Sequence, residues 1–219
     1  TFEFIYNRDV NGIYYINANL VEPTATFAGP DNRPRYPGGA ANRIHSKIDN
    51  NIVLKNQNVG YSYHLAASLE KPWSNNWFAK TAYSYGIAKN TIDPGSIAFG
   101  SWNNNQHAGD PNNPGLGYSS NTAGHRFLTA VSYRTQSGTS FSVYWETRTI
   151  GNFSYVYGGD MNFDGGTSND LIYIPKNTSE MNFEQYAASG RTFTVAEQVA
   201  AWEAFIEADK YLSKNRGKY

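Results

Sequence analysis

The chain has 219 residues, a formal net charge of +0 at pH 7 and no cysteine. The balanced charge gives no reason to expect a nucleic-acid partner, and the lack of cysteine excludes disulfides and thiol chemistry. This length is enough to bury a sizeable core in one domain. Aromatic residues make up 16% of the chain, with 17 tyrosines, and charged residues make up only 16%. That balance is typical of β-rich proteins outside the cytoplasm.

Hydropathy leaves a membrane location open. No run of about 18 apolar residues occurs, so no transmembrane helix is expected. A strand that crosses a membrane needs only about ten residues with every second one apolar, so its hydropathy averages out. The mean hydropathy of −0.59 is therefore compatible with a transmembrane barrel as well as with a soluble protein.

The N-terminal part of the chain predicts strands around an irregular segment. The chain begins at Thr1 without a methionine or a signal segment, so we expect that a signal was removed or that the chain is a piece of a longer protein. Residues 2–6, 13–20 and 44–55 are predicted to be strands. Residues 23–42 are rich in proline and glycine, which excludes a central strand. The arginines in and beside this segment are interpreted as part of a solvated loop: Arg33, Arg35 and Arg43.

From Tyr61 onward the chain alternates cleanly between apolar and polar residues, which predicts two hairpins of half-buried strands. The apolar sides of their four strands are Tyr61, Tyr63, Leu65, Ala67 and Leu69; Trp77, Ala79, Thr81, Tyr83, Tyr85 and Ile87; Phe127, Thr129, Val131 and Tyr133; and Phe141, Val143, Trp145, Thr147 and Thr149. The charged residues all fall on the opposite side: Glu70, Lys80, Arg126, Arg134, Glu146 and Arg148.

The connections between these strands differ strongly in length. The segments KPWSNN and TQSGT are short reversals, whereas residues 90–123 and 158–219 are long and polar. Short turns on one side and long loops on the other are typical of outer-membrane barrels. A soluble sandwich would show the same alternation with its aromatics in a core, so alternation alone does not decide between the two. If the first strands also belong to the barrel, residues 23–42 fall on the side of the short turns, where a long loop is unusual.

The stretch YVYGGDMNFDGGTSNDLIYIP, residues 155–175, contains a candidate metal site. Its D-x-N-x-D-G pattern is the first half of a calcium loop, in which ligands at alternate positions face one centre and a glycine allows the sharp turn. The twelfth position should be acidic and is Leu171, so any calcium affinity is expected to be weak. The alternative is an unliganded turn, because Asn, Asp and Gly also bond their own main chain. The candidate ligands are Asp160, Asn162, Asp164, Asn169 and Asp170.

Residues 194–214 predict a helix. Thr194 and Glu197 have the spacing of a capping box, which satisfies the free amides of the first turn. Apolar residues then recur at helical spacing and form one stripe. We expect this stripe to pack against the protein itself. Its members are Val195, Val199, Trp202, Phe205, Ile206 and Leu212.

No catalytic constellation is recognisable, and the sequence does not predict an enzyme. The four histidines, His45, His64, His107 and His125, are scattered without metal-ligand spacing. No G-x-S-x-G motif and no glycine-rich phosphate loop before a helix is present.

A series of motifs resembles a known family. The motifs are YSYHLAASLEKPWSNNWFAKTAYSYGIAKN, GSWNNN, HRFLTAVSYR, the GD-x-N-x-DG loop with NDLIYIP, and GRTFTVAEQVAAWEAFIEADKYLSKNRGKY. In this order they resemble the late barrel region of TonB-dependent outer-membrane transporters of the Bacteroidota type that carries an N-terminal carboxypeptidase-regulatory-like domain (Oar-like). The resemblance covers most of the chain from about residue 58 onward.

The resemblance implies a function in transport. Members of the family have a 22-stranded barrel closed by a plug, and an inner-membrane complex pulls on the plug through TonB. The implied partners are outer-membrane lipid and, through a plug that this chain does not contain, the TonB complex. The implied location is the outer membrane, and the substrate stays unknown.

The sequence thus predicts an all-β protein, residues 1–219 forming part of one transmembrane antiparallel β-barrel domain with about eight strands of a larger barrel. Residues 90–123 are expected to be a long external loop, and residues 158–219 a long external segment with the helix 194–214. Two alternatives remain: a secreted soluble β-domain that binds calcium or glycan, and a small structural outer-membrane barrel. In the barrel, the residues expected to face lipid are Leu65, Leu69, Tyr83, Phe127, Val131, Phe141, Val143 and Trp145. A closed, dry core made by these side chains would contradict the membrane interpretation.

Overall fold

A computed structural model describes residues 1–95 and 97–219 of the chain. Most of its regular structure is antiparallel β-sheet with few helices, which confirms the all-β prediction at this level. The sequence predicted one barrel domain, and the structure divides the chain into two compact units. The sheet unit contains Thr1–Ala18, Ile52–Asn105 and Asn112–Ser154. The loop unit contains Asn19–Asn51, Gln106–Pro111 and Tyr155–Tyr219.

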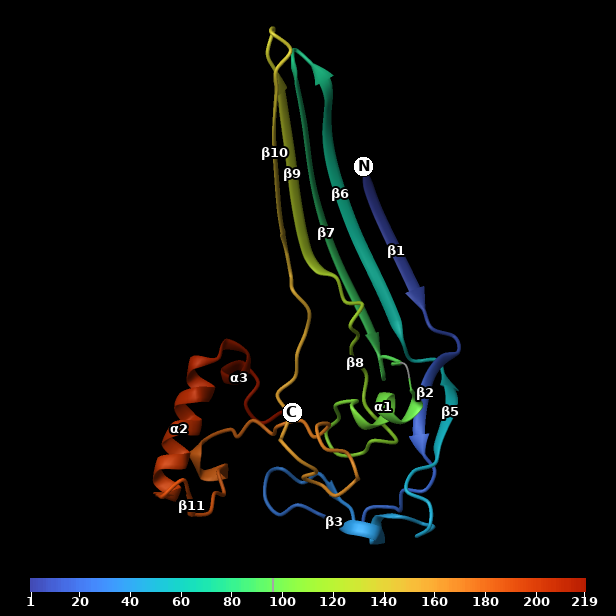
Figure 1. Cartoon of the computed structure of the whole chain (residues 1–219), viewed down its shortest axis with the longest axis vertical. Coiled ribbons are helices and arrows are strands. Elements are labelled where there is room, and N and C mark those ends of the chain that lie inside the picture. The colour runs from blue at the N-terminus through green and yellow to red at the C-terminus, as the bar shows by residue number, and fades with distance from the viewer. Residues whose placement is uncertain (96) are drawn as a thin grey trace. The chain divides into compact units, whose positions relative to one another are not determined.

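The sheet unit is built on one large antiparallel sheet (Figure 1). Its long strands lie in the order β1, β6, β7, β9, β10, and the short strand β8 (Gly117–Tyr118) pairs with β7. β1 and β10 are edge strands, so no closed barrel forms within the described residues. The bounds are β1 Phe2–Arg8, β6 Tyr61–Ser74, β7 Trp77–Asn90, β9 Gly124–Arg134 and β10 Ser140–Arg148.

The register of this sheet brings the predicted apolar sides of all four strands to one face. Tyr83 pairs with both Ala67 and Phe127, and Val131 pairs with Val143. Directly opposed residues of antiparallel strands point to the same face, so these pairs define a continuous apolar surface. β1 extends the surface, because its Phe4 pairs with Leu65. The alternation in the sequence therefore predicted the faces correctly.

Among the described residues of the sheet unit, no element covers this apolar face. Leu69 is 74% exposed, Val143 69% and Trp145 52%. Of the five long strands, only Ala88 at the end of β7 contributes a buried apolar residue. The closed, dry core that would contradict a membrane wall is not formed by these side chains.

The opposite face of the sheet is polar and carries ion pairs. Glu70 and Lys80 are directly opposed, and their charged atoms are 3.0 Å apart. Arg126 and Glu146 are also 3.0 Å apart. The hydroxyls of Ser132 and Ser142, another opposed pair, are 2.8 Å apart. Both ion pairs thus lie on the face opposite the aromatic side chains.

Two predicted N-terminal strands do not belong to the large sheet. β2 (Gly12–Asn17) pairs with β5 (Ile52–Gln57) in a separate sheet, and the short helix α1 (Ala98–Asn103) packs against both strands. β1 pairs directly with β6. The large sheet therefore has five long strands rather than about eight. The six residues of β2 pair with the six of β5 along their whole length, and Tyr15 and Asn17 of β2 are buried, so this segment forms a small sheet of its own.

This pairing corrects the predicted position of residues 23–42. Because β1 and β6 are neighbours, residues 9–60 form one connection between them. That connection leaves the sheet at the end where Arg8 pairs with Tyr61 and Lys89 pairs with Tyr118, which is the end of the other long connections. The two short reversals lie at the other end (Figure 1).

The loop unit contains short strands, short 3-10 turns and two helices. The helix predicted over residues 194–214 is interrupted at Asp209, whose carboxylate accepts from the amides of Tyr211 and Leu212 and so caps a second helix. The elements are β3 Ala25–Thr26, β4 Pro34–Arg35, η1 Gly39–Asn42, η2 Thr178–Glu180, β11 Tyr186–Ala188, β12 Arg191–Phe193, α2 Val195–Ala208 and α3 Lys210–Lys214.

The helical segment packs within its own unit. The capping box of Thr194 and Glu197 forms as predicted. Ile206 and Leu212 are buried in one cluster with Ile174 and Met181, and Val199 and Trp202 pack against it, so these four residues of the stripe pack against the protein itself as predicted. Val195 and Phe205 stay 42% and 44% exposed. None of the helices in the described part of the chain is long and apolar enough to cross a membrane.

Candidate metal centre

Three segments that are distant in the sequence meet in the loop unit: residues 31–36, 106–111 and 155–171. The amide of His107 donates to the carbonyl of Asn169 at 2.9 Å, and the amide of Leu171 donates back to the carbonyl of His107 at 3.1 Å. The amide of Tyr36 donates to the carbonyl of Asn162 at 2.8 Å. Main-chain bonds therefore fix residues 160–170 against both other segments.

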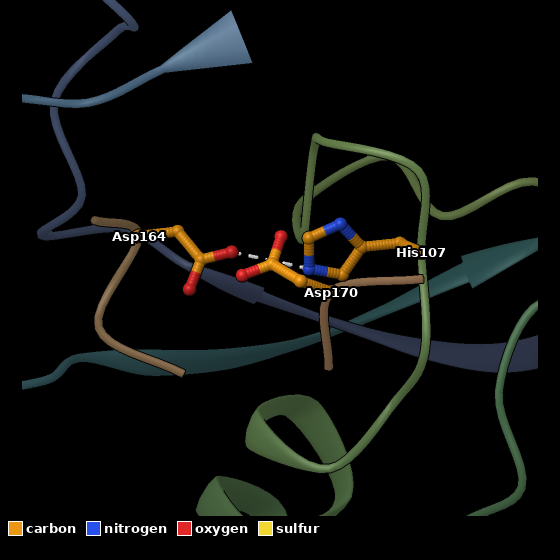
Figure 2. A group of neighbouring side chains, drawn as sticks. All are labelled: His107, Asp164 and Asp170. Atoms are coloured by element: carbon orange, nitrogen blue, oxygen red, sulfur yellow. Dashed lines mark ion pairs between the residues drawn. The ribbon is translucent and has the colours of Figure 1, made fainter. Parts of the chain in front are cut away.

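The structure brings the predicted ligands together and buries most of them. Asn162, Asp164, Asn169 and Asp170 are at most 1% exposed, and Asp160 is half-buried. Ligand atoms of Asp164, Asp170 and His107 all lie within 4.8 Å of one another (Figure 2). His107 was not predicted as a member of this cluster. It lies 62 residues before Asn169, and its spacing in the sequence carries no signal of the contact.

Residues 160–166 form a turn held by its own side chains. The carboxylate of Asp160 accepts from the amide of Gly165 at 2.9 Å. The side-chain oxygen of Asn162 accepts from the amide of Asp164 at 3.1 Å, and that of Asp164 accepts from the amide of Gly166 at 2.6 Å. These bonds are the local turn chemistry of Asn and Asp. The predicted alternative, carboxylates held by main-chain amides, therefore accounts for part of the arrangement.

Arg33 supplies a buried positive charge beside the turn. It is 1% exposed, and its guanidinium lies 3.2 Å from the carboxylate of Asp170 and 2.9 Å from that of Asp31. It also donates to the carbonyl of Leu171 at 2.6 Å. Burial acts to lower the pKa of Arg33, but the hydrogen bond and charge of Asp31 and the charge of Asp170 outweigh it, so this pKa is raised.

The prediction of solvated arginines was wrong for Arg33. Its guanidinium lies over the rings of Tyr157 and Tyr219, at 5.4 and 5.0 Å from their centroids. Arg35 lies 5.0 Å from the ring centroid of Phe163. Arg43 fits the prediction better, because its partner Asp49 is largely exposed. The reason for the error is that two of the partners that bury Arg33, Asp170 and Leu171, are more than a hundred residues away along the chain.

The tautomer of His107 follows from its two ring contacts. Its Nδ1 accepts from the amide of Gly109 at 3.0 Å, so the proton of the neutral imidazole is on Nε2. Nε2 lies 3.1 Å from a carboxylate oxygen of Asp164. With its proton on Nε2, His107 offers no lone pair to a metal at that nitrogen.

The cluster has more negative than positive charge. Asp31 and Asp170 pair with the guanidinium of Arg33, Asp164 lies close to Asp170, and the charges of both Asp164 and Asp170 act on Asp160. Burial raises the pKa of Asp160, and repulsion from Asp164 and Asp170 raises it further, against the hydrogen bond from Gly165. Carboxylates this close need donors or a cation to stay ionised together.

Two buried oxygens in the cluster have no donor. Among the residues that the structure describes, the buried side-chain polar atoms without a hydrogen-bond partner are Asp160 Oδ1 and Asn169 Oδ1. Both belong to the predicted ligand set. A buried polar atom without a partner is costly, so each calls for an explanation such as an ion.

No family model, curated protein or solved structure matches this chain. The function is therefore argued from the sheet and the cluster themselves. Chemically, the cluster offers carboxylate and amide oxygens, which suit a hard cation. Its arginine donates to the carboxylate of Asp170, and its histidine lies 3.1 Å from that of Asp164.

A substitution at Gly166 tests how tightly this cluster is packed. A Cβ at this position would lie 2.1 Å from Nδ2 of Asn169, an amide that is itself held 3.2 Å from Asp164. We expect Gly166→Ala to destabilise the loop unit by about 1–3 kcal/mol, because overpacking a buried site displaces its neighbours. Hydrogen exchange of residues 155–171 measures this as faster exchange. Gly158→Ala is the control, because nothing lies within 4 Å of its Cβ, and equal exchange in both variants would contradict the packing described here.

Proposed function

We propose that the large sheet is a section of the wall of an outer-membrane β-barrel, and that the chain is part of a TonB-dependent transporter that takes up a substrate across the outer membrane. The observation that carries the proposal is the apolar face that runs without interruption over five strands and is left uncovered. An uncovered surface of this extent on a protein marks an interaction site. Lipid suits it, because aromatic and aliphatic side chains alternate with charged ones that face the other way.

Strand length supports the same proposal. A strand that crosses a membrane needs about 9–11 residues. β6 and β7 have 14 residues each, β9 has 11 and β10 has 9. On the opposite face, the ion pairs Glu70–Lys80 and Arg126–Glu146 suit a wet barrel interior.

The connections support a definite orientation. β6 and β7 are joined by a tight turn with positive φ at Asn75 and Asn76, and β9 and β10 by residues 135–139. The connections at the other end are residues 9–60, 91–123 and everything after β10. In outer-membrane barrels the short turns are periplasmic and the long loops are external. We therefore place the long connections outside the cell.

The TonB-dependent part of the proposal rests on the family resemblance of the motifs. In it, the chain contributes barrel wall and external loops, with lipid as its direct partner. The TonB complex acts through a plug elsewhere in the transporter. No catalytic chemistry is part of the proposal, and the substrate is left unnamed.

The uncovered apolar face weighs against the alternative of a secreted soluble β-domain. A sandwich needs a second layer over the aromatics, and such a layer would bury them. Trp145 and Phe141 are 52% and 62% exposed. The calcium-binding part of that alternative concerns the loop unit alone and is compatible with a barrel.

Single cysteines test the orientation, because this chain has no cysteine of its own. Gly115→Cys lies in the connection between β7 and β9, with open space around it, and Ser137→Cys lies in the exposed short turn between β9 and β10. In intact cells, a membrane-impermeant maleimide should label the first variant and leave the second unlabelled until the outer membrane is opened. The reverse pattern would invert the orientation. Equal labelling of both variants in intact cells would refute a membrane wall.

A further inference from the structure

The amide of Asn169 has no satisfactory orientation in the cluster as a purely hydrogen-bonded structure. With Nδ2 toward Asp164, the amide donates to both carboxylate oxygens at 3.2 Å. The same Nδ2 then lies 2.9 Å from Nε2 of His107, which carries a proton, so two donors face each other. The carbonyl oxygen Oδ1 is buried without a donor.

Turning the amide by 180° removes one conflict and creates another. Oδ1 then accepts from Nε2 of His107, but it takes the position 3.2 Å from both carboxylate oxygens of Asp164. Acceptors at that distance repel each other. A cation between the carboxylate of Asp164 and the amide oxygen of Asn169 turns this repulsion into two ligand bonds.

Asp160 has the second unpartnered oxygen of the same turn. Its Oδ2 accepts from the amide of Gly165, the amide of Phe163 also acts on this carboxylate, and its buried Oδ1 has no hydrogen-bond partner. One oxygen held by the main chain and one left free is the arrangement that a monodentate carboxylate ligand needs. The negative charges of Asp164 and Asp170 act on this carboxylate as well.

We propose that the loop unit binds one calcium ion through oxygens of Asp160, Asp164 and Asn169, with the remaining ligands supplied by backbone carbonyls and water. Asp170 adds negative charge beside the ion while Arg33 and the amides of Met161 and Asn162 hold it in place. This inference goes beyond the proposed wall function and does not depend on it, because every ligand belongs to the loop unit.

The chemistry of the cluster selects calcium over other common ions. Zinc prefers nitrogen and sulfur ligands, and Nε2 of His107, the ring nitrogen that faces the cluster, carries a proton. Magnesium gives up its water reluctantly, whereas Asp164 and Asn169 are 1% and 0% exposed and demand a largely dehydrated ion. Calcium accepts irregular sets of six to eight oxygens. Because Leu171 replaces the bidentate acid, we expect an affinity in the weak extracellular range, about 10⁻⁴–10⁻³ M.

Calcium titration of the whole folded protein in detergent, followed by hydrogen exchange of residues 155–171, tests the proposal. An ion that binds only the closed cluster lowers its opening equilibrium, and at ten times the dissociation constant exchange should slow about tenfold. Magnesium at the same concentrations is the control. Equal slowing by both ions would overturn the assignment to calcium, and unchanged exchange up to about 10 mM calcium would overturn the site, since that is tenfold above the weakest affinity expected.

The variant Asp160→Asn tests whether Asp160 is a calcium ligand or only a structural residue of the turn. The asparagine oxygen can still accept from the amide of Gly165, and the change removes a charge that is repelled by Asp164. Without calcium, exchange should therefore be unchanged or slower than in the wild type, which also shows that the variant folds. With calcium, the slowing should be lost or require at least tenfold more ion. Wild-type calcium dependence in this variant would contradict Asp160 as a ligand.

Asn169→Asp should change the exchange rate and its calcium dependence in the opposite direction. A third carboxylate beside Asp164 should speed exchange without calcium, and calcium should restore protection more strongly than in the wild type, because affinity rises with ligand charge. A variant that stays unprotected at every calcium concentration would show that Asn169 is only a hydrogen-bonding residue. Glu207→Gln, an exposed carboxylate of α2 in the same unit, is the control and should behave as the wild type.

Discussion

Replacing Arg33 with methionine is expected to destabilise the loop unit by about 3–5 kcal/mol, because removing one partner of a buried ion pair leaves an uncompensated buried charge. Arg33 is 1% exposed, and its loss would leave Asp31 and Asp170 without their cation and the carbonyl of Leu171 without its donor. Methionine keeps much of the apolar contact with Tyr157 and Tyr219, so the effect reports the charge rather than the volume.

The measurement is hydrogen exchange of the amides of Tyr157 and Leu171, which donate to the carbonyls of Asp170 and His107, respectively. A loss of this size corresponds to exchange about two to almost four orders of magnitude faster. The experiment is done on the whole folded protein, and the sheet unit serves as an internal reference.

Two further variants make the result specific. Arg43→Met removes an ion pair whose acid, Asp49, has a side chain that is 79% exposed, and such a pair is worth at most about 1 kcal/mol. The double variant Arg33→Met with Asp170→Asn should recover part of the lost protection, since it removes one of the stranded charges. Equal effects of Arg33→Met and Arg43→Met would contradict the buried role of Arg33.

Arginine on the apolar face of the sheet is the second large effect. Val143 lies near the middle of β10, pairs with Val131 and is 69% exposed. If this face meets lipid, Val143→Arg should cost about 2–4 kcal/mol, the value for a cation on the lipid side of a barrel near the bilayer midplane. Unfolding of the whole protein from lipid vesicles by denaturant measures this cost.

Ser142→Arg is the matched control. Ser142 is the neighbouring residue on the polar face, where it contacts Ser132, and an arginine there should be tolerated. An equal cost at both positions would refute the assignment of the faces to lipid and lumen. A cost at Ser142 alone would invert the assignment.

The faces of the long strands were determined by the sequence itself. Side chains of a strand alternate between its two faces, so the order Tyr63, His64, Leu65 already separates the faces of β6. The capping box of Thr194 and Glu197 was predictable for a similar reason, because both partners lie within one helical turn. The turn of residues 160–166 is also local, since its side chains bond amides two to five residues away.

Strand pairing was decided by tertiary structure. Residues 13–20 and 44–55 carry enough apolar residues to predict strands, but their sequence does not state which strand they pair with. The structure places β2 against β5 and leaves β1 to pair with β6. That choice depends on residues about 35–65 positions apart, and it decides the end of the sheet from which the Pro-rich segment leaves.

The candidate metal centre shows both contributions in one place. Its carboxylates and amides were predicted from the spacing in residues 160–170, because turn residues and their ligands are neighbours in the chain. His107 and Arg33 were not, because they reach Asp164 and Asp170 only after segments far apart in the sequence have packed together. The charge balance of the cluster depends on those two residues and on burial. The sequence by itself thus determined which oxygens gather, and the tertiary structure alone decided which of them are left without a donor.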